Sequence, residues 1–308
     1  MNRNYLKMDD IKKKIRGLVT ERRAVILAHN YQPPEIQELA DLCGDSLELS
    51  IKASQTDAEV IVFCGVHFMA ETASIISPQK TVLLPRHDAG CPMADMVDPD
   101  SLAAKLTKLP PMPVVTYVNS TAAVKALSTI CCTSANVVRV VNSLPEDEIL
   151  MTPDRNLALY AASQTNKKIQ IWEGYCPTHD RLTPADVKTA REKHPGAVFI
   201  AHPECRPEVL ALADAVASTS GMLRFVRESN HGAFIVGTES GLLYPMKKDN
   251  PGKAFYPASE KMVCPNMKKI SLDDVARSLE DMEGEVKVPE DIRRPALKAV
   301  QKMLDLSK

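Results

Sequence analysis

Three cysteines of this chain share both a spacing and a neighbour. Cys91, Cys176 and Cys264 are each followed by proline, and they lie 85 and 88 residues apart. Eight cysteines and 22 prolines in 308 residues would give less than one such pair by chance. Thiolates are soft ligands that favour iron-sulfur clusters, zinc and copper. The spacing therefore predicts three repeated units, each of which brings one thiolate to a shared metal centre.

The pattern of the cysteines indicates which metal centre is expected. Structural zinc sites usually take ligands from C-x2-4-C pairs, and the sequence contains no C-x-x-C. A 4Fe-4S cluster held by three thiolates keeps one iron open, which can act as a Lewis acid in a dehydration. The other cysteines are expected to be core thiols, with two of them adjacent on the apolar side of a helix: Cys43, Cys64, Cys205 and the adjacent pair Cys131 and Cys132.

Three aligned segments provide the elements that must position these thiols. They begin at Ala24, Val114 and Val198, and each has an apolar strand, a helix, a turn bearing serine and a second helix. The strands end in polar residues, and a serine follows each of these 17, 15 or 16 residues later: His29 with Ser46, Asn119 with Ser134, and His202 with Ser218. Strand-length apolar runs alternate with helix-length segments, which is typical of parallel α/β units.

The repeat predicts three homologous α/β/α domains with parallel sheets, arranged around a pseudo-threefold axis with a central active-site cavity. Ligand sites of open α/β sheets lie beyond the carboxyl ends of the strands, so those ends are expected to face the axis. The predicted units are 1–92 with an N-terminal helix, 93–178 and 179–268, followed by a C-terminal helical segment, 269–308, that packs on the outside.

The polar residues near the strand ends suit an anionic substrate. They supply imidazole, hydroxyl and amide donors: His29, Tyr31, Ser46, Tyr117, Asn119, Ser134, His179, His202, Ser218 and Thr219. Serines that precede helices also bring backbone N–H groups and the positive helix end, although each could simply be an N-cap. Glu204 is the expected proton-transfer group. Glu239 is a second candidate, for which a strand-end or capping role is the alternative.

Charge and hydropathy exclude several classes of protein. With 38 Lys+Arg against 39 Asp+Glu, the chain has no excess of cations for binding nucleic acid or a membrane surface. No apolar stretch approaches the roughly 20 residues needed to span a bilayer. The N-terminus has no apolar region typical of a signal peptide. We therefore expect a cytoplasmic protein whose thiols are reduced.

Several motifs, in order along nearly the whole chain, resemble those of the quinolinate synthase family. They are AHNYQPPEIQELADLCGDSLELS from Ala28, the G-C-P at 90–92, Y-V-N at 117–119, C-T-S at 132–134, EGYCPTH at 173–179, HPE at 202–204, STSGM at 218–222 and the segment 262–265.

The resemblance implies an enzyme of de novo NAD biosynthesis with a 4Fe-4S cluster on Cys91, Cys176 and Cys264. Such enzymes condense iminosuccinate (iminoaspartate) with dihydroxyacetone phosphate to give quinolinate, releasing phosphate and two waters. An aspartate oxidase or aspartate dehydrogenase is the expected source of iminosuccinate. By resemblance, Tyr31, His202 and Glu204 are the catalytic candidates. The substrate would be bound by residues from all three units: His29, Ser46, Tyr117, Val118, Asn119, Ser134, His179, His202, Pro203, Glu204, Ser218 and Thr219.

The sequence differs from some members of the family at one position, and two other functions would also explain the three cysteines. Some members carry C-x-x-C at the third ligand, whereas this chain has Cys264-Pro265-Asn266-Met267, so a disulfide switch at that position is not expected. A different iron-sulfur hydro-lyase, acting on a small hydroxy acid, would share the three cysteines. An iron-sulfur redox sensor would share them too, but it would tolerate the loss of the Glu204 carboxylate.

Overall fold

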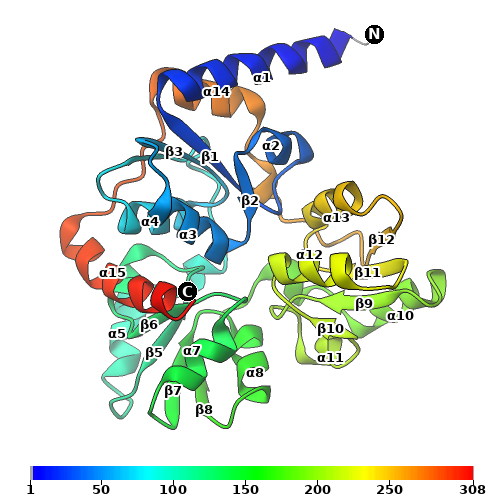
Figure 1. The fold of residues 1–308 in the computed structure, drawn as a ribbon. Helices are drawn as coiled ribbons and strands as arrows, with labels where there is room; N and C mark the ends of the chain where they lie inside the picture. The colour runs from blue at the N-terminus through cyan, green and yellow to red at the C-terminus, as the bar shows by residue number, and fades with distance from the viewer. Residues whose placement is uncertain (1–2, 308) are drawn as a thin grey trace.

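Three α/β units surround a common centre in the computed structural model, which describes residues 3–307 (Figure 1). Each unit contains one four-stranded sheet, and all strand pairs are parallel. In every sheet the second strand lies at one edge and the order is second, first, third, fourth. The predicted class, three similar α/β/α domains around a pseudo-threefold axis, is confirmed.

The first unit forms the upper part of Figure 1. Its strands are β1 (Ala24–His29), β2 (Leu42–Gly44), β3 (Val60–Cys64) and β4 (Thr81–Leu83), and its helices are α2 (Pro34–Leu39), α3 (Ser46–Gln55) and α4 (His67–Ile76). Helix α1 (Arg3–Glu21) precedes them and packs against α14 (Leu272–Asp281).

The second and third units repeat this arrangement. The second contains η1 (Ala94–Met96), α5 (Pro99–Leu106), β5 (Val114–Tyr117), α6 (Ala122–Ala126), β6 (Ile130–Cys132), α7 (Val137–Ser143), β7 (Glu148–Thr152), α8 (Arg155–Ser163) and β8 (Lys168–Ile171). The third contains α9 (Pro177–Asp180), α10 (Pro184–Lys193), β9 (Val198–Ala201), α11 (Pro207–Leu210), β10 (Ala215–Val216), α12 (Thr219–Glu228), β11 (Ala233–Gly237), η2 (Ser240–Leu242), α13 (Leu243–Asp249), β12 (Ala254–Pro257) and η3 (Asn266–Lys268).

The edge strands β2, β6 and β10 differ from the sequence interpretation, which expected only a turn between the two helices of each repeat. They are two or three residues long, too short for an alternating pattern to be visible in the sequence. Cys131 and Cys132 therefore lie on strand β6 and pair with β5, and their placement on a helix is wrong. Both thiols are buried, as expected of core cysteines.

A repeated lysine shows that the three units share their polar anchors as well as their topology. Lys80, Lys167 and Lys253 each directly precede the fourth strand of their sheet. Their ammonium groups donate to carbonyls just beyond the helix that follows the second strand: Lys80 to Ala58 at 2.6 Å, Lys167 to Leu144 at 2.8 Å and Lys253 to Ser229 at 2.6 Å. Cations close to the C-terminal end of a helix interact favourably with the helix dipole.

The C-terminal helix joins the first two units. Helix α15 (Glu290–Asp305) packs against α4 of the first unit and against α6 and β6 of the second, and it lies along their outer side in Figure 1. Its buried side chains belong to the core shared by these units: Ala296, Ala299, Val300, Met303 and Leu304. The strands of each sheet fall within one predicted unit, whereas the unit boundaries themselves remain predictions.

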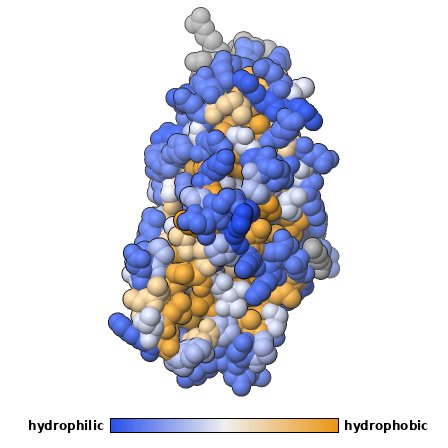
Figure 2. Space-filling model, turned by 90° about the vertical axis from the view of Figure 1, so that its left-hand side faces the viewer, coloured by the Kyte–Doolittle hydropathy of each residue, from blue (hydrophilic) through white to orange (hydrophobic). Residues whose placement is uncertain are grey.

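Between residues 3 and 307 no helix combines the length and the apolar character needed to cross a bilayer. On the face shown in Figure 2, hydrophilic residues cover most of the upper half, and hydrophobic residues are more frequent lower down. The large apolar side chains that are exposed come from separate segments: Leu127, Leu159, Leu212 and Val263.

Candidate active site

The three sheets direct the carboxyl ends of their strands toward one cavity of about 180 Å³. In a sheet of order second, first, third, fourth, the connections diverge between the first and third strands, which opens a crevice at that point. Residues that end or follow these strands line the cavity from every unit, among them His29, Val66, Tyr117, His202 and Glu239. The repeat thus places three such crevices around a single site.

Most of the residues expected at the site line this cavity. They are His29, Tyr31, Ser46, Cys91, Tyr117, Asn119, Ser134, Cys176, His179, His202, Glu204, Thr219 and Cys264. Val118, Pro203 and Ser218 are buried next to lining residues but do not line it themselves. The structure thereby brings the predicted residues together, while their individual roles stay predictions.

The three spaced cysteines occupy equivalent places. Each lies in the loop after the fourth strand of its sheet and contributes to the cavity wall. Burial raises the pKa of all three thiols, that of Cys91 to about 12. For Cys91 and Cys176 the negative charge of Glu204 raises the pKa further, and repulsion by another of the three cysteines adds a smaller effect. Without a compensating cation these sulfurs are therefore protonated at neutral pH.

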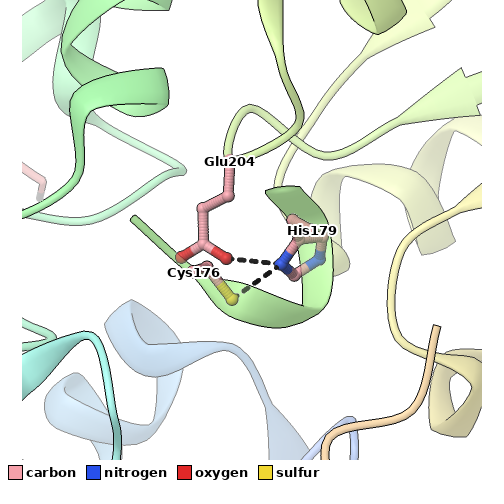
Figure 3. Close-up of side chains that lie close together, drawn as sticks. All are labelled: Cys176, His179 and Glu204. Atoms are coloured by element: carbon pink, nitrogen blue, oxygen red, sulfur yellow. Dashed lines mark hydrogen bonds and ion pairs between the residues drawn. The ribbon is translucent and has the colours of Figure 1, made fainter. Parts of the chain in front are cut away.

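A second group of potential metal ligands surrounds Cys176 (Figure 3). The Nδ1 atom of His179 lies 2.7 Å from a carboxylate oxygen of Glu204 and 3.2 Å from the Cys176 sulfur. The ligand atoms of these three residues all lie within 4.8 Å of one another. His179 and Glu204 are almost fully buried, so this group could hold a metal ion or, without one, form a tight hydrogen-bonded cluster.

Glu204 remains ionised despite its burial. Burial alone would raise its pKa, but the neighbouring imidazoles of His179 and His202 and a hydrogen bond from Tyr117 lower the pKa to about 2. The second imidazole is further away, with Nδ1 of His202 at 3.6 Å from the carboxylate. At neutral pH this group is therefore a carboxylate that accepts hydrogen bonds at the centre of a buried site.

The two strand-end histidines are neutral at physiological pH. Burial lowers the pKa of both His29 and His202 to about 3, although the Glu204 charge partly opposes this. His202 contacts the hydroxyl of Ser134 through Nε2 at 3.2 Å, and its ring stacks on that of His179 with centroids 4.7 Å apart. These imidazoles can therefore donate or accept hydrogen bonds without adding a cation.

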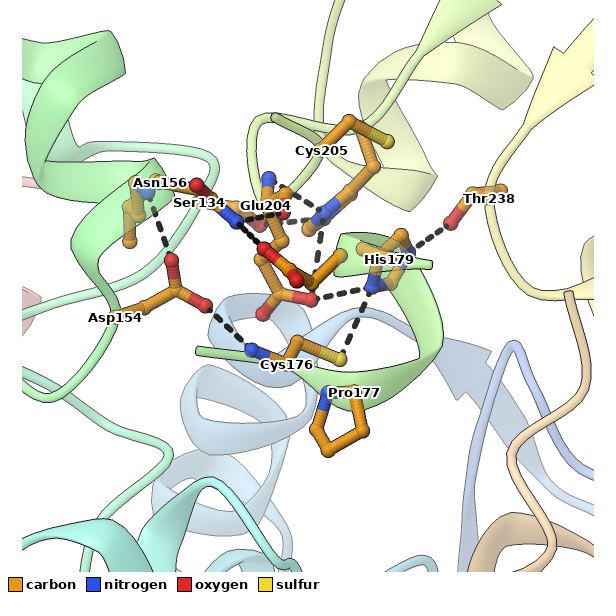
Figure 4. Close-up of polar contacts among 12 residues, drawn as sticks. Ser134, Asp154, Asn156, Cys176, Pro177, His179, Glu204, Cys205 and Thr238 are labelled. Atoms are coloured by element: carbon orange, nitrogen blue, oxygen red, sulfur yellow. Dashed lines mark hydrogen bonds and ion pairs between the residues drawn. The ribbon is translucent and has the colours of Figure 1, made fainter. Parts of the chain in front are cut away.

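Tyr31 joins the first unit to the third. Its hydroxyl lies 2.5 Å from Thr238 Oγ1, which in turn lies 2.8 Å from Nε2 of His179. Burial raises the pKa of the Tyr31 phenol well above its usual value, with the charge of Glu204 as a further cause. Tyr31 is therefore a neutral phenol, and Thr238 and His179 connect its hydroxyl to Glu204. Figure 4 shows the part of this connection that runs from Thr238 through His179 to Glu204.

Two long helices begin at the cavity wall. Ser46 is the first residue of α3, whose N-cap is Asp45, and Thr219 is the first residue of α12, whose N-cap is Ser218. The caps meet across the unit boundary, where Ser218 donates to Asp45 at 3.0 Å. The N-cap alternative thus applies to Ser218, whereas Ser46 and Thr219 stand at helix N-termini that favour anions.

Comparison with known proteins decides the family. A family model described as quinolinate synthetase A protein matches residues 13–305. Quinolinate synthase of Geotalea uraniireducens is 58% identical over 96% of this chain and 97% of its own length. Quinolinate synthase 1 of Methanosarcina acetivorans is 55% identical over 96% and 97%, and quinolinate synthase of Thermodesulfovibrio yellowstonii is 54% identical over 95% and 97%. The chain belongs to the quinolinate synthetase A family.

Three polar residues at or beside the cavity were not expected from the sequence. Asp45 and Arg181 line the cavity, and Asn30 donates to the hydroxyl of Thr219 at 2.9 Å. Asp45 carries the signature of a capping box, with Glu48 three residues later, and this could have identified it. Arg181 follows a short helix and has no comparable local signal, so only the tertiary structure places it at the cavity.

Proposed function

We propose that this chain condenses iminosuccinate with dihydroxyacetone phosphate to form quinolinate, releasing phosphate and two waters, as a step of NAD biosynthesis. Family membership and the names of the similar proteins, quinolinate synthases, support the product. The observation that carries the proposal is the convergence of Cys91, Cys176 and Cys264, one from each unit, on a single cavity lined by hydrogen-bond donors.

The donor set fits one 4Fe-4S cluster on these three cysteines. All three thiols border the same cavity, and their raised pKa values mean that a bound cation would be needed to hold them as thiolates. A single metal ion on Cys176, His179 and Glu204 would leave the other two thiols without a role. When bound, the cluster would supply an open iron as a Lewis acid for the loss of hydroxide.

The anionic groups of the substrates match the positive features of the cavity wall. The N-termini of α3 and α12 present Ser46 and Thr219, and Arg181 adds a cation. The side-chain oxygen of Asn119 is buried and lacks a partner among residues 3–307. It is therefore available to accept a hydrogen bond from an imine, amine or hydroxyl group of the bound substrate.

Proton transfers are assigned to Glu204, Tyr31 and His202. Glu204 is a buried carboxylate and is proposed to accept the proton lost when the carbon-carbon bond forms. Tyr31 is proposed to donate to the carbonyl oxygen during isomerisation, because its phenol is neutral and hydrogen-bonded to Thr238. His202 is neutral, and its Nε2 atom lies 3.2 Å from the Ser134 hydroxyl, so a proton relay through these two groups is assigned to it.

The proposal extends to the supply of substrate and to the compartment. Iminosuccinate is an unstable imine, so an aspartate oxidase or aspartate dehydrogenase is the proposed source. All eight cysteines are free in the structure, which suits the reducing cytoplasm.

Anaerobic purification and assay test this function. The reconstituted chain should contain about four irons and four sulfides and should form quinolinate from the two substrates. Glu204→Gln should retain the cluster but lose at least about 100-fold in kcat. Turnover of malate-like or citrate-like acids instead would favour a hydro-lyase, and full activity of Glu204→Gln would refute the assigned proton transfer. An intact cluster with no quinolinate formed would refute the function.

A further inference from the structure

We propose that Asp154 and Glu239 are positioning residues. Each holds the loop of one cysteine by accepting a hydrogen bond from its backbone N–H group, Asp154 that of Cys176 and Glu239 that of Cys264. The inference rests on the proposed cluster site and adds residues that no local motif connects with it. It concerns the backbone of the cysteine loops, since a thiolate can point to a shared centre only if its loop is fixed.

In the second unit, Asp154 performs two tasks with its two oxygens. It is the N-cap of α8, and one oxygen accepts from the N–H of Leu157 at 2.8 Å. The other oxygen accepts from the N–H of Cys176 at 3.1 Å (Figure 4). The side chain is 2% exposed, so both hydrogen bonds lie away from water. Capping alone would need only the first of these oxygens.

In the third unit, Glu239 makes the same pair of contacts with a longer side chain. One oxygen accepts from the N–H of Gly241 at 2.7 Å and from the Lys268 ammonium at 3.0 Å. The other accepts from the N–H of Cys264 at 3.1 Å. The side chain is fully buried.

The two carboxylates occupy equivalent positions in the repeat. Asp154 lies two residues beyond the end of β7, and Glu239 lies two residues beyond the end of β11. Each caps the helical turn that follows and also reaches a cysteine more than 20 residues further along the chain. The same arrangement with different side chains indicates that the contact to the cysteine is the shared feature.

The first unit holds its cysteine by another route. Val66 stands two residues beyond the end of β3 and makes no side-chain cap. Within the first unit, the N–H of His67 donates to the carbonyl of Ala89 at 2.8 Å. The loop of Cys91 is also tied to the third unit, because Asn266 donates to the carbonyl of Gly90 at 2.8 Å. The loop that contains Cys264 and Asn266 therefore supports two of the three cysteines, and Glu239 holds that loop by the N–H of Cys264.

Matched variants distinguish the loss of the hydrogen bond to a cysteine N–H from the loss of a helix cap and from a general loss of stability. Asp154→Ser keeps an N-cap oxygen but removes the acceptor for Cys176. Its control is Asp98→Ser at the N-cap of α5, where the partner is Ser101 rather than a cysteine. Glu239→Gln keeps the shape but turns one oxygen into a donor. Its control is Glu71→Gln, which removes a carboxylate that accepts from the backbone of Ala122 at 3.0 Å.

The measurement is the rate at which a chelator removes iron from the reconstituted chain under anaerobic conditions. Asp154→Ser and Glu239→Gln should release iron at least about tenfold faster than wild type, whereas both controls should stay within about twofold. Melting temperatures of the iron-free chains provide the comparison for general destabilisation. If Asp154→Ser fails to fold, Asp154→Asn replaces it with the same expectation, because it keeps the volume and one oxygen.

The outcomes distinguish this inference from the proposed function. Iron release from Asp154→Ser and Glu239→Gln no faster than from their controls would overturn the positioning role while leaving the cluster assignment intact. A wild-type chain that takes up no iron would refute the cluster assignment, and this inference with it.

Discussion

Gly241 lies where a single added carbon should disturb the candidate acid Tyr31. A Cβ atom at position 241 would stand 2.6 Å from the carbonyl oxygen of Tyr31, 2.8 Å from its carbonyl carbon and 2.7 Å from Nζ of Lys268. The lysine can move because its side chain is flexible, whereas the Tyr31 backbone is fixed between β1 and α2. Gly241→Ala should therefore displace the main chain of Tyr31.

The size of the displacement follows from the contact distances. Ordinary contacts begin at 3.4 Å, so the Tyr31 backbone or η2 must shift by about 0.6 to 0.8 Å. Overpacking of this kind costs about 1–3 kcal/mol in the free energy of unfolding. A catalytic group misplaced by about 1 Å can lose about 100-fold in rate, so we expect kcat to fall about tenfold. The assays are urea denaturation and quinolinate formation per intact cluster.

Gly252→Ala is the control, because a Cβ atom at position 252 meets nothing within 4 Å. It should change the unfolding free energy by less than about 1 kcal/mol and leave kcat unchanged. If Gly241→Ala behaved like Gly252→Ala in both assays, the coupling of Gly241 to Tyr31 would be wrong. A loss of stability with unchanged kcat would show that the shift does not reach the phenol.

The remaining predictions concern a cysteine loop, an exposed ion pair and the C-terminal helix. Gly174 lies two residues before Cys176, and a Cβ atom there would stand 2.5 Å from the carbonyl oxygen of Pro153, so Gly174→Ala should lower the iron content. Gly90 lies beside Cys91, and a Cβ atom there would meet no atom within 4 Å, so Gly90→Ala should retain its iron. Hydrogen bonds from arginines lower the pKa of Glu290 to about 2, so its contribution to stability is present above about pH 4.5 and is lost as the pH falls toward 2. The melting temperature difference between wild type and Glu290→Gln, both without iron, should shrink over that range, and a constant difference would contradict it. Met303→Ala should cost about 2–5 kcal/mol in urea denaturation, because α15 belongs to the shared core, and a cost below about 1 kcal/mol would show that it does not.

Local patterns in the sequence are sufficient to predict the repeat and the main strands. Val60–Cys64 is a continuous apolar run and forms the strand expected of it, because a strand buried on both faces needs apolar residues throughout. The three Cys-Pro pairs mark equivalent loops after the fourth strands. Three-residue strands such as Leu42–Gly44 could not be predicted, since they exist only where a neighbouring strand offers hydrogen bonds.

The roles of the carboxylates depended on tertiary structure. Sequence reasoning gave Glu239 a proton-transfer role or a capping role, and the structure shows it capping η2 while accepting from the Cys264 N–H. Asp154 follows a strand in the sequence, but nothing in the sequence indicates its contact with the N–H of Cys176. In a sequence, a carboxylate that only caps a helix cannot be told from one that also holds a distant loop. The difference is whether the second carboxylate oxygen has a partner in that loop, and this depends on how the chain folds.

The sequence by itself determined that three similar α/β units exist, which thiols are equivalent and which residues follow the strands, because these properties depend on short-range patterns and on the period of the repeat. Only the tertiary structure decided which of these residues meet. Tyr31 reaches Thr238, and Ser218 reaches Asp45, across boundaries between units. Those partners are more than 170 residues apart, and their contact depends on how three sheets pack around one cavity.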